Sequence, residues 1–144
     1  MDETVGMIER VAAPAGGPRR MSGMVDRVVA GGFVFFSAIR GRTTADGFAA
    51  DVRDQARQAF ANIQASLAET GLTLAAVVKV TVYLNDLDLR PGFHQVWREL
   101  FAGSPPARTV VRVADANAER GGGALFALDV IAYAGAGNEE RSTR

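Results

Sequence analysis

Residues 77–84 read VVKVTVYL, and their side chains alternate between two classes. The apolar members of one parity are Val78, Val80, Val82 and Leu84. The intervening members carry polar groups and are Lys79, Thr81 and Tyr83. Because successive side chains of a strand point to opposite faces, this period of two predicts a strand with one face in the core.

Four further strands are predicted around this one. They cover Val25–Ala30, Phe33–Ile39, Arg108–Ala114 and Ala124–Tyr133. The Gly31-Gly32 pair between the first two predicts a hairpin turn.

Two helices are predicted between the strands. Asp51 is the expected cap of a helix that runs to about Thr70, and Gly71 stands where a left-handed stop is expected. The apolar positions of this helix recur every three or four residues and are Val52, Ala56, Ala59, Phe60, Ile63 and Leu67. The second helix spans Pro91–Phe101. Its apolar positions are Phe93, Val96, Trp97, Leu100 and Phe101.

This order, β-β-α-β-α-β-β, predicts an α+β fold with a mixed sheet and both helices on one face. The other sheet face then needs a cover, and the simplest cover is a second copy of the chain. We expect a single domain over residues 23–134, a flexible arm over 1–22 and a disordered tail over 135–144.

The composition excludes several functional classes. The 144 residues carry no formal net charge, which argues against nucleic acid or an anionic membrane as the main partner. The chain has no cysteine, so disulfides and thiolate chemistry are excluded. No apolar run approaches the length of a signal peptide or a membrane span, so we expect a soluble, cytoplasmic protein.

Arg108 is the first candidate for chemistry, because it opens a strand directly after Pro105-Pro106-Ala107. Alternation places Arg108, Val110 and Arg112 on one face of that strand. A guanidinium here offers a rigid fork of donors to a carboxylate or phosphate. The alternative is a strand-end arginine that forms a structural salt bridge.

Asp129 is the second candidate, since it is the only charged residue between Ala124 and Tyr133. A carboxylate in so apolar a strand must be paired, or its pKa must rise. Either condition suits a group that handles protons. A structural ion pair, or a strand whose second face meets solvent, explains it equally well.

His94 and Ser37 are weaker candidates. His94 is the only histidine and has no clustering ligand residues around it in the sequence, so a metal site is not expected. No histidine–acid pattern marks Ser37 as a nucleophile. The glycines lack phosphate-loop or dinucleotide spacing.

Taken in order, these segments resemble the Rid family of YjgF-type reactive-intermediate deaminases. The matching pieces are Phe35-Phe36-Ser37, Asp51-Val52, Asn62-Ile63, residues 77–84, Asp86-Leu87, Phe93 with Trp97 and Phe101, Pro106-Ala107-Arg108-Thr109-Val110 and Leu128-Asp129-Val130-Ile131-Ala132. The similarity runs from about residue 22 to residue 134.

The resemblance implies a chorismate-mutase-like fold and a homotrimer with ligand pockets between subunits. It implies hydrolysis of 2-imino or 2-enamino acids to 2-oxo acids and ammonia, with no cofactor and no metal. Arg108 would hold the substrate carboxylate and Asp129 would position the attacking water. The other substrate-binding residues implied are Ser37, Ala38, Phe93, His94 and Val110.

The chain also departs from the best-known deaminases of this family. An Arg follows Gly17-Pro18 where those proteins have Tyr, Val110 stands in place of Cys or Ser, His94 in place of Asn, and Asp129 in place of Glu. These changes leave three functions open: deamination of small imines, deamination of a larger enamine within a dedicated pathway, or binding of small carboxylates by a non-catalytic trimer. RNA cleavage is disfavoured by the zero net charge.

Overall fold

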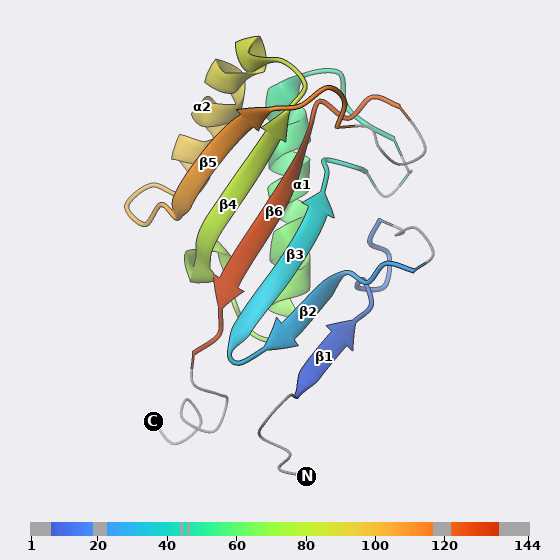
Figure 1. Ribbon diagram of the computed structural model, residues 1–144, viewed down its shortest axis with the longest axis vertical. Coiled ribbons are helices and arrows are strands. Elements are labelled where there is room, and N and C mark those ends of the chain that lie inside the picture. The colour runs from blue at the N-terminus through green and yellow to red at the C-terminus, as the bar shows by residue number, and fades with distance from the viewer. Residues whose placement is uncertain (1–6, 19–22, 44, 46, 117–121, 136–144) are drawn as a thin grey trace.

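A computed structural model describes residues 7–18, 23–43, 45, 47–116 and 122–135. Within them the chain forms six strands and two α-helices (Figure 1). The strands are β1 (Ile8–Val11), β2 (Arg27–Ala30), β3 (Phe33–Ile39), β4 (Val77–Leu84), β5 (Ala107–Arg112) and β6 (Phe126–Tyr133). The helices are α1 (Val52–Ala68) and α2 (Arg90–Leu100), and the short 3-10 turns η1 (Leu74–Ala76) and η2 (Leu87–Leu89) flank β4.

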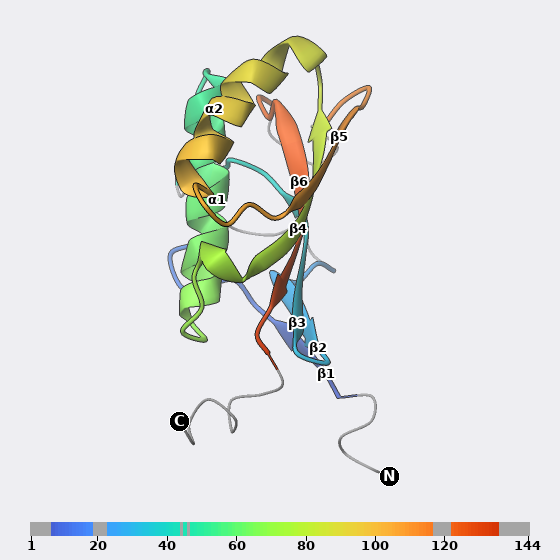
Figure 2. The same cartoon turned by 90° about the vertical axis from the view of Figure 1, so that its left-hand side faces the viewer.

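The strands form one mixed sheet in the order β1-β2-β3-β6-β4-β5. Only β4 and β5 pair in parallel, and the other neighbours are antiparallel. Both helices lie against one face of the sheet (Figure 2). The predicted α+β class, mixed sheet and one-sided helices are therefore confirmed. No described helix covers the second face of the sheet, which we call the bare face (Figure 2).

The N-terminal strand was not expected from the sequence. Ile8–Val11 pairs with β2, and the Asp26 amide also donates to the Val11 carbonyl over 3.0 Å. The prediction of a flexible arm is therefore wrong for these residues. Four residues hold too short a pattern to indicate a strand, and the neighbour across the sheet supplies the ordering. The rest of the predicted arm at 1–6 and 19–22, and the tail from 136 onward, lie outside the described residues.

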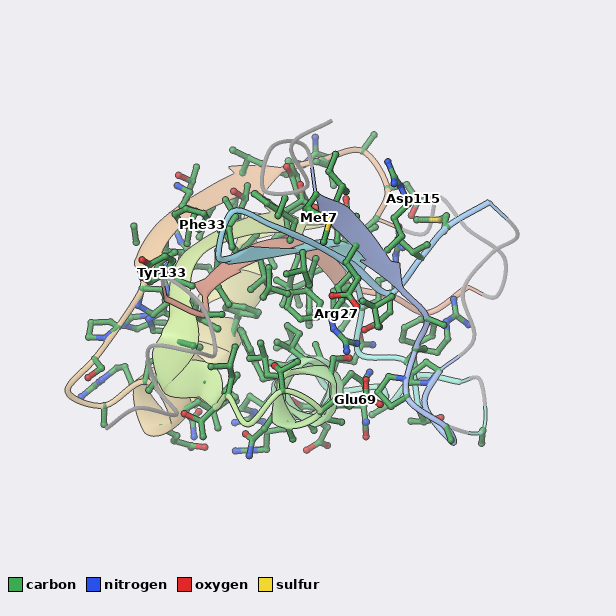
Figure 3. The ribbon with its side chains drawn as sticks, turned by 90° about the horizontal axis from the view of Figure 1, so that it is seen from below. Met7, Arg27, Phe33, Glu69, Asp115 and Tyr133 are labelled. Carbon is green, nitrogen blue, oxygen red and sulfur yellow. The ribbon has the colours of Figure 1, made fainter. Side chains whose placement is uncertain are left out.

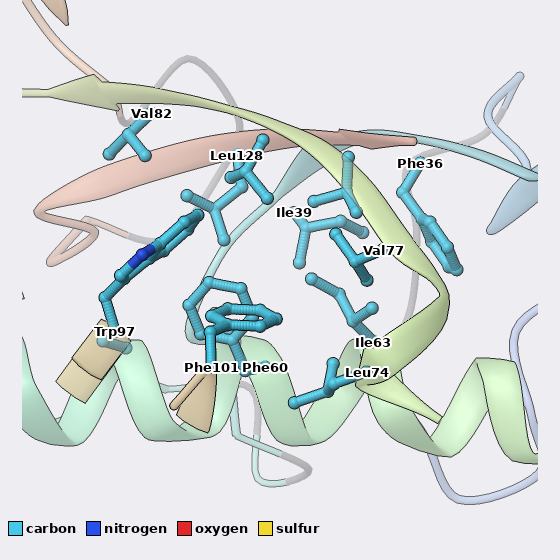
Figure 4. Close-up of a cluster of buried hydrophobic side chains, with 14 of the residues drawn as sticks. Phe36, Ile39, Phe60, Ile63, Leu74, Val77, Val82, Trp97, Phe101 and Leu128 are labelled. Carbon is cyan, nitrogen blue, oxygen red and sulfur yellow. The ribbon is translucent and has the colours of Figure 1, made fainter. Parts of the chain in front are cut away.

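The core lies between the sheet and the two helices (Figure 4). Phe60 of α1 packs edge-on against Trp97 and Phe101 at the α2 end, with ring centroids 6.1 and 5.3 Å apart. Two predicted core positions are wrong, since Val78 is 43% exposed and Leu100 is 38% exposed. A register shift between Val77 and Lys79 explains the first: it turns Val77 inward and leaves Val78 outside. Leu100 ends α2 on its solvent side.

Helix ends and one buried ion pair follow simple local rules. The Asp51 carboxylate accepts the Arg53 amide over 2.7 Å and caps α1, and Gly71, after the end of the helix, has the predicted positive φ of 76°.

Arg27 of β2 points toward α1 (Figure 3). Its guanidinium pairs with Glu69 at the end of α1 over 2.7 Å and with the neighbouring Asp26 over 2.8 Å. This arginine is buried, and it is fully partnered.

Candidate functional site

Arg108 is the second residue of β5, and its side chain lies on the helix side of the sheet. Strand register aligns Arg108 with Val80, which is fully buried against the helices. The guanidinium carbon stacks 4.8 Å from the centroid of the Trp97 ring. Its Nη1 lies 3.0 Å from Nδ1 of His94. Two residues of α2, one helical turn apart, therefore hold the arginine in place.

The contact with His94 determines the state of that ring. A guanidinium can only donate hydrogen bonds, so Nδ1 of His94 must accept one. The ring proton then sits on Nε2, which leaves an N–H donor beside Arg108. The pair presents only donors to a ligand: the remaining guanidinium N–H groups and the imidazole N–H.

Arg108 has no counter-ion among the residues that the structure describes. Throughout the described part of the chain, no carboxylate lies within salt-bridge distance of it, and it is half-buried. Burial, and then the positive charge of nearby Arg90, lower the pKa of Arg108. Arg27, also withdrawn from solvent, has two carboxylates. Since a partly desolvated cation without a partner is unfavourable, an anionic ligand would stabilise Arg108.

Asp129 lies at the centre of a second polar cluster. Its Oδ2 accepts the Tyr83 hydroxyl over 2.9 Å, while its Oδ1 accepts the Ala38 amide over 3.0 Å and the Ser37 hydroxyl over 3.3 Å. Ser37 and Ala38 form a bulge in β3, where the register with β6 shifts and Ala38 takes a φ of 56°. The hydrogen bond to Asp129 is the main reason that the pKa of Tyr83 is raised. The carboxylate thus holds the bulge in place.

The two clusters lie on opposite faces of the sheet. Asp129 is aligned with Thr81 on the bare face, whereas Arg108 is aligned with Val80 on the helix face. Within a single chain, Asp129 therefore does not face Arg108. Across β4, Val80 is aligned with both Arg108 and Val130, which places Asp129 one position away and on the other face.

The remaining predicted site residues divide between the clusters and the core. His94 joins Arg108, while Ser37 and Ala38 join Asp129. Val110 is partly buried and packs against the core. Phe93 is 1% exposed and packs on the rings of neighbouring core residues, so it lines no open surface.

Sequence reasoning missed three contributors. Trp97 was predicted as core only, yet its ring also supports the Arg108 guanidinium. Tyr83 was predicted on the outer face of its strand without a partner, and the structure pairs it with Asp129. Arg90 carried no signal except that it stands four residues before His94, which puts both on one helix face.

A pocket of about 280 Å³ borders the β3 bulge and contains no residue of the Arg108 cluster. It is lined by residues 14–18, by the end of β3 and by the side of α1 that carries Gln58, Ala61, Asn62 and Ala65. Ala38 is the one predicted site residue in its wall, and neither Arg108 nor Asp129 contributes to it. Among the residues that the structure describes, no group of His, Asp or Glu could hold a metal ion, and no helix is long and apolar enough to cross a membrane.

Comparison with known proteins identifies the family. The family model described as endoribonuclease L-PSP matches residues 18–134, most of the chain. The chain belongs to this family, the Rid family of YjgF and RutC proteins. The resemblance drawn from the sequence motifs is thus confirmed.

Sequence relatives in the family cover only part of the chain. A RutC family protein of Pyrococcus horikoshii is 39% identical over 83 residues, which are 58% of this chain and 63% of that protein. A 2-iminobutanoate/2-iminopropanoate deaminase of Dermatophagoides farinae is 36% identical over 64 residues, which are 44% of this chain and 50% of that protein. The match therefore spans less than two thirds of these relatives.

Solved structures of the family match almost throughout. TdcF of E. coli with bound serine has a TM-score of 0.76 and 25% identity, over 87% of this chain and 98% of that one. The Rid protein YyfA of Yersinia pestis has a TM-score of 0.79 at 24% identity, over 88% of this chain and 99% of that one, and shows the fold alone. The architecture is therefore that of Rid proteins.

Proposed function

We propose that this chain hydrolyses 2-imino or 2-enamino acids to 2-oxo acids and ammonia, without a cofactor. The proposal rests on the environment of Arg108. Its half-buried guanidinium is held between Trp97 and His94, and no carboxylate of the described residues pairs with it. Such a fork of donors suits the carboxylate of an amino-acid derivative. A relative is named 2-iminobutanoate/2-iminopropanoate deaminase, and the related TdcF structure holds serine, which supports the same ligand class.

The proposed reaction needs only substrate positioning and modest acid–base assistance from the protein. Water adds to the imine carbon, a C–O bond forms, the C–N bond breaks, and the nitrogen leaves as ammonia with the protons of that water. Arg108 anchors the carboxylate so that the imine carbon is held in one position. Assistance to proton transfer then contributes typically ~10²–10⁴-fold. In this proposal Asp129 orients the water.

Because Arg108 and Asp129 lie on opposite faces of one sheet, the proposed site needs two copies of the chain. The bare sheet face offers an apolar surface for a second copy, with Phe33, Phe35, Val111 and Tyr133 each 38–44% exposed. We propose a homotrimer in which Asp129 of one copy lies beside Arg108 of the next. Analytical ultracentrifugation tests the assembly: the expected mass is three times 15.2 kDa, and a monomer would refute it.

The decisive assay measures ammonia release from imines made in situ by an amino-acid oxidase. Arg108→Ala should lose the enzyme-dependent rate while the protein stays folded. Arg112→Ala is the matched control, since Arg112 is an exposed arginine at the far end of the same strand. Hydrolysis by Arg108→Ala at the wild-type rate would overturn the proposal.

Mixing variants tests the shared site. Arg108→Ala and Asp129→Ala chains, each inactive alone, should regain activity when they are unfolded and refolded together. Random assembly of a trimer places one intact Arg108 opposite one intact Asp129 at about a quarter of the interfaces. Absence of any recovery would show that the two residues do not share a site.

A second candidate function is binding without catalysis, as a trimer that holds small carboxylates. It is favoured by the hydrogen bonds of Asp129, whose two oxygens already accept the Tyr83 hydroxyl and two groups of the β3 bulge. Measurable affinity for 2-oxo acids, with no ammonia release from any imine in a panel of small and large side chains, would decide for it. Release from large enamines alone would instead indicate a pathway-dedicated deaminase.

A further inference from the structure

Arg90 gives the candidate anion site a second positive charge. It is the first residue of α2 and stands one helical turn before His94, so the two side chains share a helix face, with about 5–6 Å between their Cβ atoms. Trp97 continues that face one turn further on. The cation of Arg108 is held against the middle and the end of this row.

Among the described residues, the two arginines of this surface form no ion pair. No carboxylate in the described residues forms an ion pair with Arg90 or Arg108. Of the arginines on α1, in contrast, Arg53 pairs with Asp51 and Arg57 pairs with Asp54. The whole chain has equal numbers of acidic and basic residues, so the positive charge gathered between α2 and β5 is a local feature.

The short turn η2 runs directly into α2, so the start of α2 offers no open backbone amides. Leu89 has helical backbone angles, and the Arg90 amide donates to the Leu87 carbonyl. Asp86 caps η2, where its carboxylate accepts the Asp88 amide over 2.9 Å. The second positive charge of the site is therefore the Arg90 side chain, which a single substrate carboxylate on Arg108 would leave without an ion pair.

We propose that the ligand of this site carries two carboxylates, a 2-imino or 2-oxo dicarboxylate, with the first held by Arg108 and the second by Arg90. The inference rests on the carboxylate-anchoring role of Arg108 in the proposed function. His94 stands one helical turn after Arg90 and contacts Arg108, and in this proposal its Nε2 proton donates to a polar atom of the ligand. Trp97 supports the first carboxylate's anchor and excludes water from below it.

The test compares two oxo acids of equal chain length that differ only in the second carboxylate. Calorimetry with 2-oxoglutarate and 2-oxopentanoate should show roughly tenfold tighter binding of the dicarboxylate, as expected for one added charge-assisted contact. Arg90→Gln should reduce this ratio to near one, because the loss falls mainly on 2-oxoglutarate. Arg98→Gln is the matched control and should keep the ratio, because Arg98 is an exposed arginine on α2 that pairs with no carboxylate of the described residues.

The outcomes separate this inference from the proposed activity. Equal affinities of wild type for the two oxo acids, a ratio that survives Arg90→Gln, or no binding of either acid would each overturn the dicarboxylate ligand. Ammonia release decides the activity independently. A retained preference for 2-oxoglutarate without ammonia release from any imine would support the inference and refute the deaminase.

Discussion

Gln55 allows a prediction about the loop that leads into the strand of Asp129. This side chain is 1% exposed on α1, and its Nε2 donates to the carbonyls of Ala49 at 2.7 Å and Gly123 at 2.8 Å. Its Oε1 accepts the Leu125 amide over 3.0 Å. One buried amide thus ties the loop before α1 to the loop before β6.

Gln55→Met removes these three hydrogen bonds and keeps the length of an unbranched side chain. Gly123 is exposed, so its carbonyl can bond water instead. The Ala49 carbonyl and the Leu125 amide belong to partly buried residues, and these two groups lose their partner. Each unsatisfied group costs about 1–3 kcal/mol, which gives an expected loss of about 2–6 kcal/mol in the free energy of unfolding. For a chain of this size the melting temperature should fall by roughly 5–20 °C.

Urea denaturation measures the change, and Gln58→Met supplies the control. Gln58 lies half-buried on the same helix, and its side-chain amide donates to the Asn62 side chain over 2.8 Å. Such a pair contributes about 0.2–0.5 kcal/mol, so this variant should stay close to wild type. If Gln55→Met loses no more stability than Gln58→Met, the buried amide does not hold the two loops, and the reasoning is refuted.

Three further predictions concern packing, capping and the Asp129 cluster. Gly41→Ala would place a methyl group against the backbone of the first turn of α1 and should cost about 1–3 kcal/mol in urea unfolding, while Gly122→Ala, which meets open space, should be neutral. The pKa of Asp51 is lowered to about 2, chiefly by its hydrogen bond to the Arg53 side chain, so the carboxylate stabilises the fold above its ordinary pKa and loses this effect as the pH falls toward 2. The difference in melting temperature between wild type and Asp51→Ala should therefore narrow as the pH is lowered from the ordinary pKa of Asp toward 2. A difference that stays constant would contradict the prediction. The hydrogen bond to Asp129 is the main cause of the raised pKa of Tyr83, and Asp129→Asn replaces this charge-assisted bond with a weaker, neutral one. Phenolate absorbance should therefore develop at lower pH than in wild type, and an unmoved titration would show that the bond to Asp129 does not set the pKa of Tyr83.

Much of the fold follows from local signals. The alternation over residues 77–84 predicted β4 with its bounds intact, and Asp51 and Gly71 marked the ends of α1. These signals are readable because strand parity, capping and positive φ depend on a few consecutive residues. The short strand Ile8–Val11 was missed because its order comes from pairing with β2 rather than from its own pattern.

The candidate site divides in the same way. The sequence alone singled out Arg108 by its place after Pro105-Pro106-Ala107, and Asp129 as a lone charge in an apolar strand. Three features of the site come from contacts between distant segments: the two residues lie on opposite faces, His94 and Trp97 hold the arginine, and Tyr83 donates to the carboxylate. The physical reason is register: parity within one strand assigns its side chains to two faces, but the alignment of neighbouring strands is set by contacts between distant segments, and one position of shift exchanges the faces.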